Sequence, residues 1–278
     1  MSGARAAPTA ADLADHVEGI AALLAGTANV IMQLSRPPIG HAVVESTVVG
    51  GQVTRHPLKR LRTTFTYLAV AMMGDDAERE AYRQAVDRSH AAVRSRPGSP
   101  VAYDAFDPEL QLWVAACLYR GAVDVRTRLH GPMDDATADA FYRRASVFGT
   151  TLQVRPDMWP ADRGAFERYW QESLAHVSID DTVRSYLTDL MRLRHLPAPV
   201  RVAQAGFSTF VTTGFLPERF RDEMRLAWSD RDQRRFDLLL AAVGAASRAL
   251  PGVVRRFPFN AFLWDMRVRA RLGLPLVY

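Results

Sequence analysis

Apolar residues return every three or four positions along most of this 278-residue chain, which is the spacing of amphipathic helices. The exception is residues 41–57, where β-branched residues and glycines favour a short hairpin or an irregular loop. The pattern therefore predicts an all-α fold. We expect helices at about residues 11–25, 28–35, 57–73, 75–94, 108–129, 135–148, 160–176, 179–195, 199–213, 217–227 and 230–249.

Several of these predicted helices carry recognisable end signals. Gly26 follows the first helix where a C-terminal cap would lie, and Ser178 with Asp181 has the spacing of a capping box. Asp107 precedes Pro108, a residue that suits the first position of a helix. We interpret Asp107 as an N-cap rather than as a catalytic acid.

The composition allows one large core without covalent crosslinks. Hydrophobic residues make up 48% of the chain, and no repeat or linker divides it, which predicts one domain over residues 1–278 with a basic, aromatic C-terminal extension. The only cysteine, Cys117, excludes an intramolecular disulfide framework and thiolate clusters for zinc or iron–sulfur. Cys117 lies in an apolar run, where burial raises a thiol pKa and favours packing over iron ligation.

The ends of the chain bear on its location. The N-terminus carries acids where a signal peptide needs an apolar core, and the apolar passage from Ile20 to Leu34 is too short to span a bilayer. We therefore expect a cytoplasmic protein. Three interpretations are open for the C-terminal segment 255–274: packing on its own core, on a partner subunit, or on an anionic membrane surface.

The net charge of +5 comes almost wholly from arginine, because Lys59 is the only lysine. Acids and arginines alternate through most of the predicted helices, as in the run from Glu78 to Arg88. This alternation is typical of solvated helix faces rather than of a basic patch. We expect no nucleic-acid partner.

One histidine stands out because of its apolar surroundings. At helical spacing His90 shares a face with Tyr82, Val86 and Val93, and Arg94 follows one turn later on roughly the same side. Such a histidine is either a metal ligand or a buried, hydrogen-bonded core residue.

Most catalytic templates are absent from the chain. It contains no glycine-rich phosphate loop, no G-x-S-x-G motif, no H-E-x-x-H motif and no repeated Glu-x-x-His pairs. The other histidines have no second histidine three or four residues away; they are His16, His41, His56, His130, His176 and His195. What remains is a single imidazole in an apolar helical setting, and haem is a metal group that needs only that from the protein.

Three segments carry a family resemblance in order and spacing: HPLKRLRTTFTYLAVAMMG (56–74), AVDRSHAAVRS (85–95) and VAYDAFDPELQLWVAACLYRG (101–121). With GFLPERFRDEMRLAW (214–228), they resemble the family that contains the fungal MpaB-type oxygenases and the bacterial latex clearing proteins, over roughly residues 25–258. The resemblance implies a mostly helical, globin-related core that binds haem b. It also implies a hydrophobic small-molecule substrate, oxidised with dioxygen and in some members cleaved at a carbon–carbon double bond.

The resemblance also assigns roles to individual residues. The axial histidine and the arginine four residues later match His90 and Arg94, and the distal arginine and threonine match Arg60 and Thr64. Latex clearing proteins have a lysine where this chain has Thr63, which argues against polyisoprene as the substrate. Glu45 is the candidate for the acidic residue that those enzymes place upstream of the distal arginine.

The same residues have simpler interpretations. Arg60 is otherwise a surface cation, and Thr64 a hydroxyl bonded to its own helix. Trp113 and Tyr103 fit the core better than they fit haem stacking. Two other functions therefore stand beside the oxygenase: a haem-binding sensor or carrier without turnover, and an all-α binding or regulatory protein without a cofactor.

Overall fold

The hydrophobic spacing is realised as helices in nearly every described part of the chain. The computed structural model describes residues 18–46 and 57–277, and within these ranges it contains no strand. The helices are α2 (Gly19–Leu34), α3 (Pro37–Val44), α4 (Pro57–Met73), α5 (Asp76–His90), α6 (Pro108–His130), α7 (Asp135–Ala145), α8 (Val147–Thr150), α9 (Arg163–Leu174), α10 (Asp181–Met191), α11 (Ala198–Phe215), α12 (Glu218–Glu223), α13 (Asp230–Ala249), α14 (Gly252–Arg255) and α15 (Phe259–Arg271), with a short 3-10 helix at Pro156–Met158.

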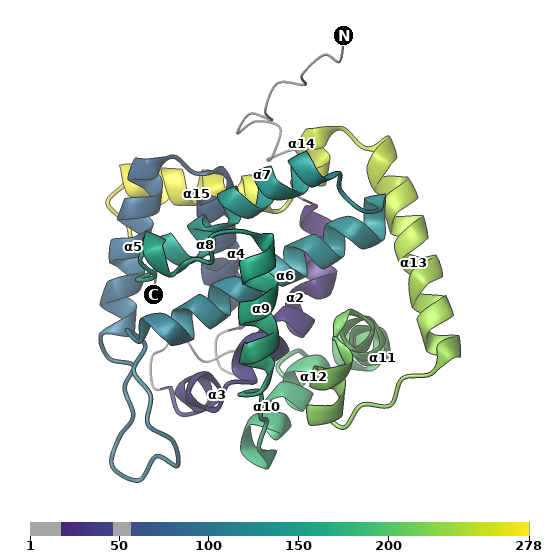
Figure 1. The fold of residues 1–278 in the computed structure, drawn as a ribbon, viewed down its shortest axis with the longest axis horizontal. Helices are drawn as coiled ribbons and strands as arrows, with labels where there is room; N and C mark the ends of the chain where they lie inside the picture. The colour runs from purple at the N-terminus through teal and green to yellow at the C-terminus, as the bar shows by residue number, and fades with distance from the viewer. Residues whose placement is uncertain (1–17, 47–56, 278) are drawn as a thin grey trace.

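The central element is α6, which crosses the middle of the molecule between α2, α8 and α13 (Figure 1). Its start confirms the predicted cap: Asp107 accepts hydrogen bonds from the N–H groups of Glu109 and Leu110, and Pro108 holds the first helical position. The apolar spacing of α6 then buries Trp113 and Cys117 completely. An all-α single domain is thus built around this helix.

An aromatic cluster fills the space between α6, α7 and α9. The rings of Trp113 and Trp170 stack with centroids 5.1 Å apart, and Tyr119 meets Phe166 edge to face at 4.7 Å. Trp159 and other rings continue the cluster toward α7. Because these rings are large and buried, they contribute much of the apolar burial in this part of the domain.

Two helices pack on α6 at unusually short range. A Cβ at Gly121 would lie 2.3 Å from the Nδ2 atom of Asn29, which instead donates to the Cys117 carbonyl at 2.7 Å. A Cβ at Gly244 of α13 would lie 2.4 Å from the Leu129 carbonyl oxygen. Glycine at both positions therefore allows α2 and α13 to approach α6.

The N-terminal helices differ from the sequence prediction. We expected a break at Gly26, but α2 is continuous through it. A glycine inside a helix costs about 1 kcal/mol, and burial of Ile31 and Met32 on the same helix offsets this. The hairpin or loop expected from His41 onward is also wrong for residues 41–44, since α3 starts at Pro37 and continues to Val44; residues 47–56 lie outside the described part.

Two further boundaries were predicted wrongly. The N-cap of α10 is Asp180, which accepts from the Val183 N–H, and not Ser178, whose N–H donates to the Ser35 carbonyl at 2.9 Å. The backbone of Ser178 is held in this contact with a distant segment, so Ser178 does not cap α10. The end of the helix predicted over residues 135–148 is also wrong, because α7 ends at Ala145 and the short helix α8 continues through Gly149.

The helix that carries His90 is shorter than predicted. A capping box formed by Asp75 and Glu78 starts α5, but α5 ends at His90 instead of continuing to Arg94. The chain then turns, and Ser95 donates to the Tyr103 carbonyl while Ala105 donates to Val93. These backbone bonds replace the last predicted turn of helix and fold residues 91–107 into a projecting loop (Figure 1).

The C-terminal segment packs on its own domain. The buried face of α15, with Phe259, Leu263 and Met266, lies on α4, and Phe259 stacks on Phe65 at 5.5 Å. An ion pair between Arg62 and Asp265 at 3.0 Å borders this contact. No helix within residues 18–46 or 57–277 is long and apolar enough to cross a membrane.

Candidate functional site

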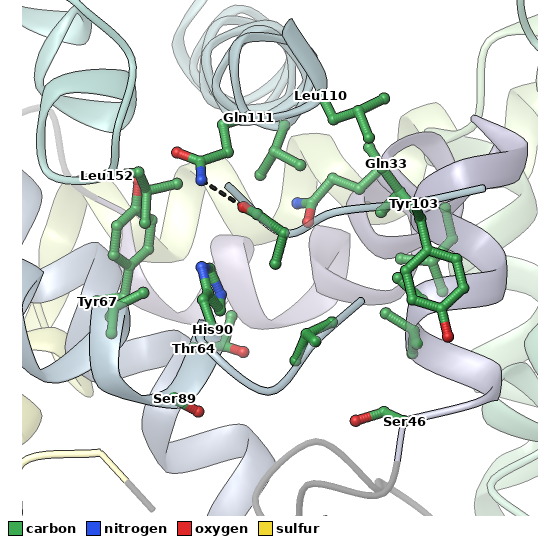
Figure 2. A pocket seen from close by; sticks show the side chains of 18 of the residues that line it. Gln33, Ser46, Thr64, Tyr67, Ser89, His90, Tyr103, Leu110, Gln111 and Leu152 are labelled. Atoms are coloured by element: carbon green, nitrogen blue, oxygen red, sulfur yellow. Dashed lines mark hydrogen bonds between the residues drawn. The ribbon is translucent and has the colours of Figure 1, made fainter. Parts of the chain in front are cut away.

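A pocket of about 250 Å³ lies between α2, α3, α4, α5, α6 and the loop 91–107 (Figure 2). Most of its walls are aliphatic: Val30, Leu34, Ile39, Val43, Val86, Val93, Leu110, Val114, Leu118 and Leu152. Such a lining suits an apolar ligand or cofactor, with the few polar side chains setting its orientation.

His90 lies on the wall of this pocket, at the C-terminal end of α5. Figure 2 shows its ring directed toward the pocket interior, between Thr64 and Gln111. The Nδ1 atom is buried, and the ring of Phe106 packs edge-on against the imidazole, with 6.4 Å between the ring centroids. Val86 of α5 and Val93 of the loop 91–107 line the same pocket, whereas Tyr82, which we expected on the same face, is not among the lining residues.

Thr63 and Thr64 reach the pocket from α4. The Thr63 hydroxyl donates to the Lys59 carbonyl at 3.1 Å, and the Thr63 carbonyl accepts from the Tyr82 hydroxyl at 2.8 Å. Thr64 lies beside His90 in the close view (Figure 2). Helices α4 and α5 thus bring Thr64 and His90 to one cavity although 26 positions separate them in the sequence.

The structure describes the side chain of only one of the two arginines predicted at the site, Arg60 and Arg94. Arg60 belongs to α4, but its side chain lies outside the described residues. Arg94 does not line the pocket: its side chain is 63% exposed and pairs with Asp104 at 3.3 Å. The prediction that Arg94 lies one helical turn beyond His90 is wrong, because the bridge between Arg94 and Asp104 belongs to the loop and not to α5.

A hydrogen-bonded network fixes the pocket wall next to His90. The Gln111 amide donates to the Ala105 carbonyl at 2.6 Å, and its oxygen accepts from the Gln153 N–H at 2.6 Å. The Gln153 side chain in turn donates to Asp87, one turn before His90. Burial raises the pKa of Asp87. Sequence reasoning missed Gln111, although a glutamine within the apolar stretch of α6 was a visible signal.

A second histidine forms a different kind of site nearby. His41 is 3% exposed, and its two ring nitrogens face Glu45 at 3.1 Å and Asp180 at 2.6 Å. Glu45 also accepts from the hydroxyls of Ser99 at 2.6 Å and Tyr103 at 3.1 Å. The bond from Ser99, with smaller contributions from Tyr103 and His41, lowers the pKa of Glu45. The cluster ties the loop 91–107 to α3 and α10.

The donor set restricts what the pocket around His90 can hold. No group of three or more histidine, cysteine, aspartate or glutamate side chains is placed to bind a metal ion within the described ranges. Cys117 lies outside the pocket, and burial raises its thiol pKa well above the usual value. A haem supplies four nitrogen ligands of its own and needs one axial imidazole with apolar walls, so the residues present fit haem by type.

Comparison with known proteins gives a family match over most of the chain. The model described as "ER-bound oxygenase mpaB/B'/Rubber oxygenase, catalytic domain" matches residues 14–245, which include the whole pocket except Val277. Uncharacterized proteins of Mycobacterium tuberculosis and Mycobacterium bovis are each 51% identical over 255 residues, covering 92% of this chain and all of the relative. No solved structure matches the chain significantly.

Proposed function

Because the chain belongs to the family of ER-bound oxygenase mpaB/B′ and rubber oxygenase catalytic domains, we propose that it is a haem-b-dependent oxygenase acting on a hydrophobic small molecule. Oxidative cleavage of a carbon–carbon double bond with dioxygen is the reaction we propose. The observation that carries the proposal is the imidazole of His90 in a pocket whose walls are mostly aliphatic. A single domain over residues 1–278 with a globin-related core is part of the same proposal.

His90 would be the residue that holds the haem iron. A neutral imidazole offers one ring nitrogen to iron while its other N–H is held by a protein acceptor, which fixes the tautomer. The haem would supply the iron that activates dioxygen. Gln111 and Gln153 support this assignment, because their bonds to Ala105 and Asp87 hold the chain on both sides of His90.

Arg60 and Thr64 would be the catalytic donors. Both lie on α4 one helical turn apart, and both carry donors that stabilise negative charge developing on an oxygen atom during oxidation. Arg94 would pair with an anionic haem propionate by exchanging its partner Asp104, which lies on the pocket wall. The aliphatic walls exclude water and favour an apolar substrate.

The size of the pocket adds a requirement. Its 250 Å³ lies below the range of about 300–1,000 Å³ for ligand pockets, and haem is a large ligand. We propose that the loop 91–107 moves outward as the cofactor enters, because it forms one wall of the pocket and two of the bonds that hold it meet at a single side chain, Glu45. The anchor at Glu45 therefore influences how easily the pocket opens.

The test is the absorption spectrum of the purified protein, oxidised and reduced, beside His90→Ala. We expect a Soret band in the wild type that is lost or shifted in His90→Ala and kept in His176→Ala, which removes an exposed histidine instead. Oxygen uptake with unsaturated apolar compounds then tests turnover. A band without uptake over a broad panel favours a sensor or carrier, and no band after haem reconstitution contradicts the oxygenase.

A further inference from the structure

A second pocket lies at the far end of α10. Its volume is about 660 Å³, it opens between α11 and the start of α13, and it shares no lining residue with the pocket around His90. The lining residues are Arg192, Arg194, Arg201, Val202, Ala205, Gly206, Thr209, Phe210, Thr213, Ala227, Trp228 and Asp232. We call it the arginine pocket, since three of its side chains are guanidinium groups.

Positive charge in the arginine pocket is poorly neutralised. Arg194 pairs with Asp189 at 3.2 Å, but neither Arg192 nor Arg201 forms an ion pair with any described residue. Elsewhere arginines are commonly paired: Arg163, for example, contacts both Asp135 and Asp139. Two uncompensated guanidinium groups on one cavity favour an anion.

The only carboxylate on the lining offsets part of this charge. Asp232 accepts hydrogen bonds from the backbone N–H and the hydroxyl of Ser229 in the capping box of α13. These bonds lower its pKa, so Asp232 is anionic at neutral pH. The lining therefore carries three arginines and one carboxylate, which leaves an excess of positive charge.

The backbone places two of the arginines on the cavity by a left-handed turn. Leu193 has φ 54° and follows α10, where the Arg194 N–H donates to the Asp189 carbonyl at 2.9 Å. A residue in this left-handed conformation at the C-terminal end of a helix is usually glycine. The chain turns sharply at Leu193, just after α10 ends. Arg192 and Arg194 flank this residue, and both line the pocket.

The remaining walls are aromatic and apolar. Trp228 packs against Phe210 with ring centroids 5.4 Å apart, and its indole N–H is occupied by the Gln233 amide oxygen at 2.9 Å. Val202 of α11, which lines the pocket, is 81% exposed. A ligand held here would therefore combine an anionic group with an apolar part.

We propose that the arginine pocket binds a phosphate group carried on an apolar molecule. Guanidinium groups bind phosphate oxygens in a bidentate manner, and Arg192 and Arg201, which form no ion pair with a described residue, match a doubly charged group better than a single carboxylate. The phosphate belongs either to a free phosphate compound or to a lipid headgroup, and Val202 would contact the apolar part in both cases. This site is separate from the proposed oxygenase pocket.

The test is a binding measurement with two probes on the full chain. Inorganic pyrophosphate is titrated by calorimetry, and phosphatidylcholine vesicles with and without phosphatidic acid are used in a sedimentation assay. The variant is Arg192→Gln with Arg201→Gln. The charge-matched control is Arg143→Gln with Arg271→Gln, which removes two exposed arginines of α7 and α15.

We expect wild type and control to bind at least one probe, and the Arg192/Arg201 variant to bind it at least about tenfold more weakly, since charge-assisted hydrogen bonds are lost. Binding of pyrophosphate identifies a free phosphate compound; binding only of vesicles that contain phosphatidic acid identifies a lipid headgroup. No binding to either probe, or an equal loss in the control, overturns the proposal. The haem spectrum is a separate readout and should be unchanged in both variants.

Discussion

Two histidines on neighbouring parts of the molecule have opposite surroundings. His41 is buried between Glu45 and Asp180, and hydrogen bonds hold the pKa values of both carboxyls below their usual range. His90 lies in an aliphatic pocket, and the nearest carboxyl on its helix, Asp87, has a raised pKa because of burial. The surroundings of His41 therefore favour ionised carboxylates, whereas burial beside His90 disfavours the ionised form of Asp87.

The difference separates a structural role from a ligand-binding role. An imidazole with carboxylates on both ring nitrogens is held in place and contributes to stability, so it has no nitrogen left for a ligand. An imidazole that points into an apolar cavity suits a neutral ligand to a metal group. We expect substitutions in the two regions to affect different measurements.

The largest effect on stability should come from His41→Ala. It removes two charge-assisted hydrogen bonds and leaves a cavity between α3 and α10, so we expect the free energy of unfolding to fall by about 2–4 kcal/mol. His90→Ala should change it by less than about 1 kcal/mol, because that side chain is only half-buried. Urea denaturation of the haem-free protein measures both.

A larger loss of unfolding free energy in His90→Ala than in His41→Ala would contradict the comparison of the two histidines. If His90→Ala lowered stability as much as His41→Ala, the imidazole of His90 would be a core residue rather than a ligand. His176→Ala provides the baseline, since His176 is exposed. The haem spectra should show the opposite ranking, with the band depending on His90 and not on His176.

A smaller effect is expected from Glu45→Gln. The amide keeps the shape of the side chain but accepts less strongly from Ser99 and Tyr103, which should cost about 1 kcal/mol. The loop 91–107 should then exchange its amide hydrogens faster, at Ser95 and Ala105 in particular, and mass spectrometry can measure this. Glu80→Gln, on the exposed face of α5, should leave the exchange of the loop unchanged.

The pH dependence of stability should reflect the same carboxylates. The pKa values of Glu45 and Asp180 are lower in the folded protein than their ordinary values of 4.5 and 3.8, so the unfolded chain binds more protons in that range. The stabilisation is present above those ordinary values and is lost as the pH falls through the folded pKa values. Urea midpoints below pH 5 should fall more steeply in the wild type than in Glu45→Gln.

The smallest effect should come from Asp87→Asn, with the opposite sign. Because burial raises the pKa of Asp87, its ionised form is unfavourable in the folded state at neutral pH. An asparagine can still accept from Gln153, so we expect a gain of about 0.5 kcal/mol at pH 7 that disappears at acid pH. A loss of stability at pH 7 would mean that the charge itself holds the Gln111 and Gln153 network.

Local signals in the sequence predicted the helices well. Asp107 and Pro108 defined the start of α6, and the run from Asp230 to Ala249 is the helix that its pattern indicated. The place of Val86 beside His90 on the pocket wall was also visible, because it depends only on helical spacing within α5. These features need no information from distant parts of the chain.

Contacts between distant segments could not be predicted. Asp180 lies 139 positions from His41, so no local pattern indicated that His41 is buried and paired. The end of α5 at His90 depends on backbone bonds to residues 103–105, which compete with another turn of helix that the spacing favours. For the same reason Arg94 was placed on the wrong element.

The aromatic cluster between α6, α7 and α9 gives this protein an optical signature. Trp113 and Trp170 lie nearly parallel, with 14° between their ring planes, and Phe166 links this pair to Tyr119, Tyr142 and Trp159. Fixed, asymmetric packing of such rings produces near-ultraviolet circular dichroism, which vanishes when side chains lose their unique arrangement even if helices persist. Tertiary order in this half of the domain can therefore be followed at wavelengths well away from the Soret region used to detect haem.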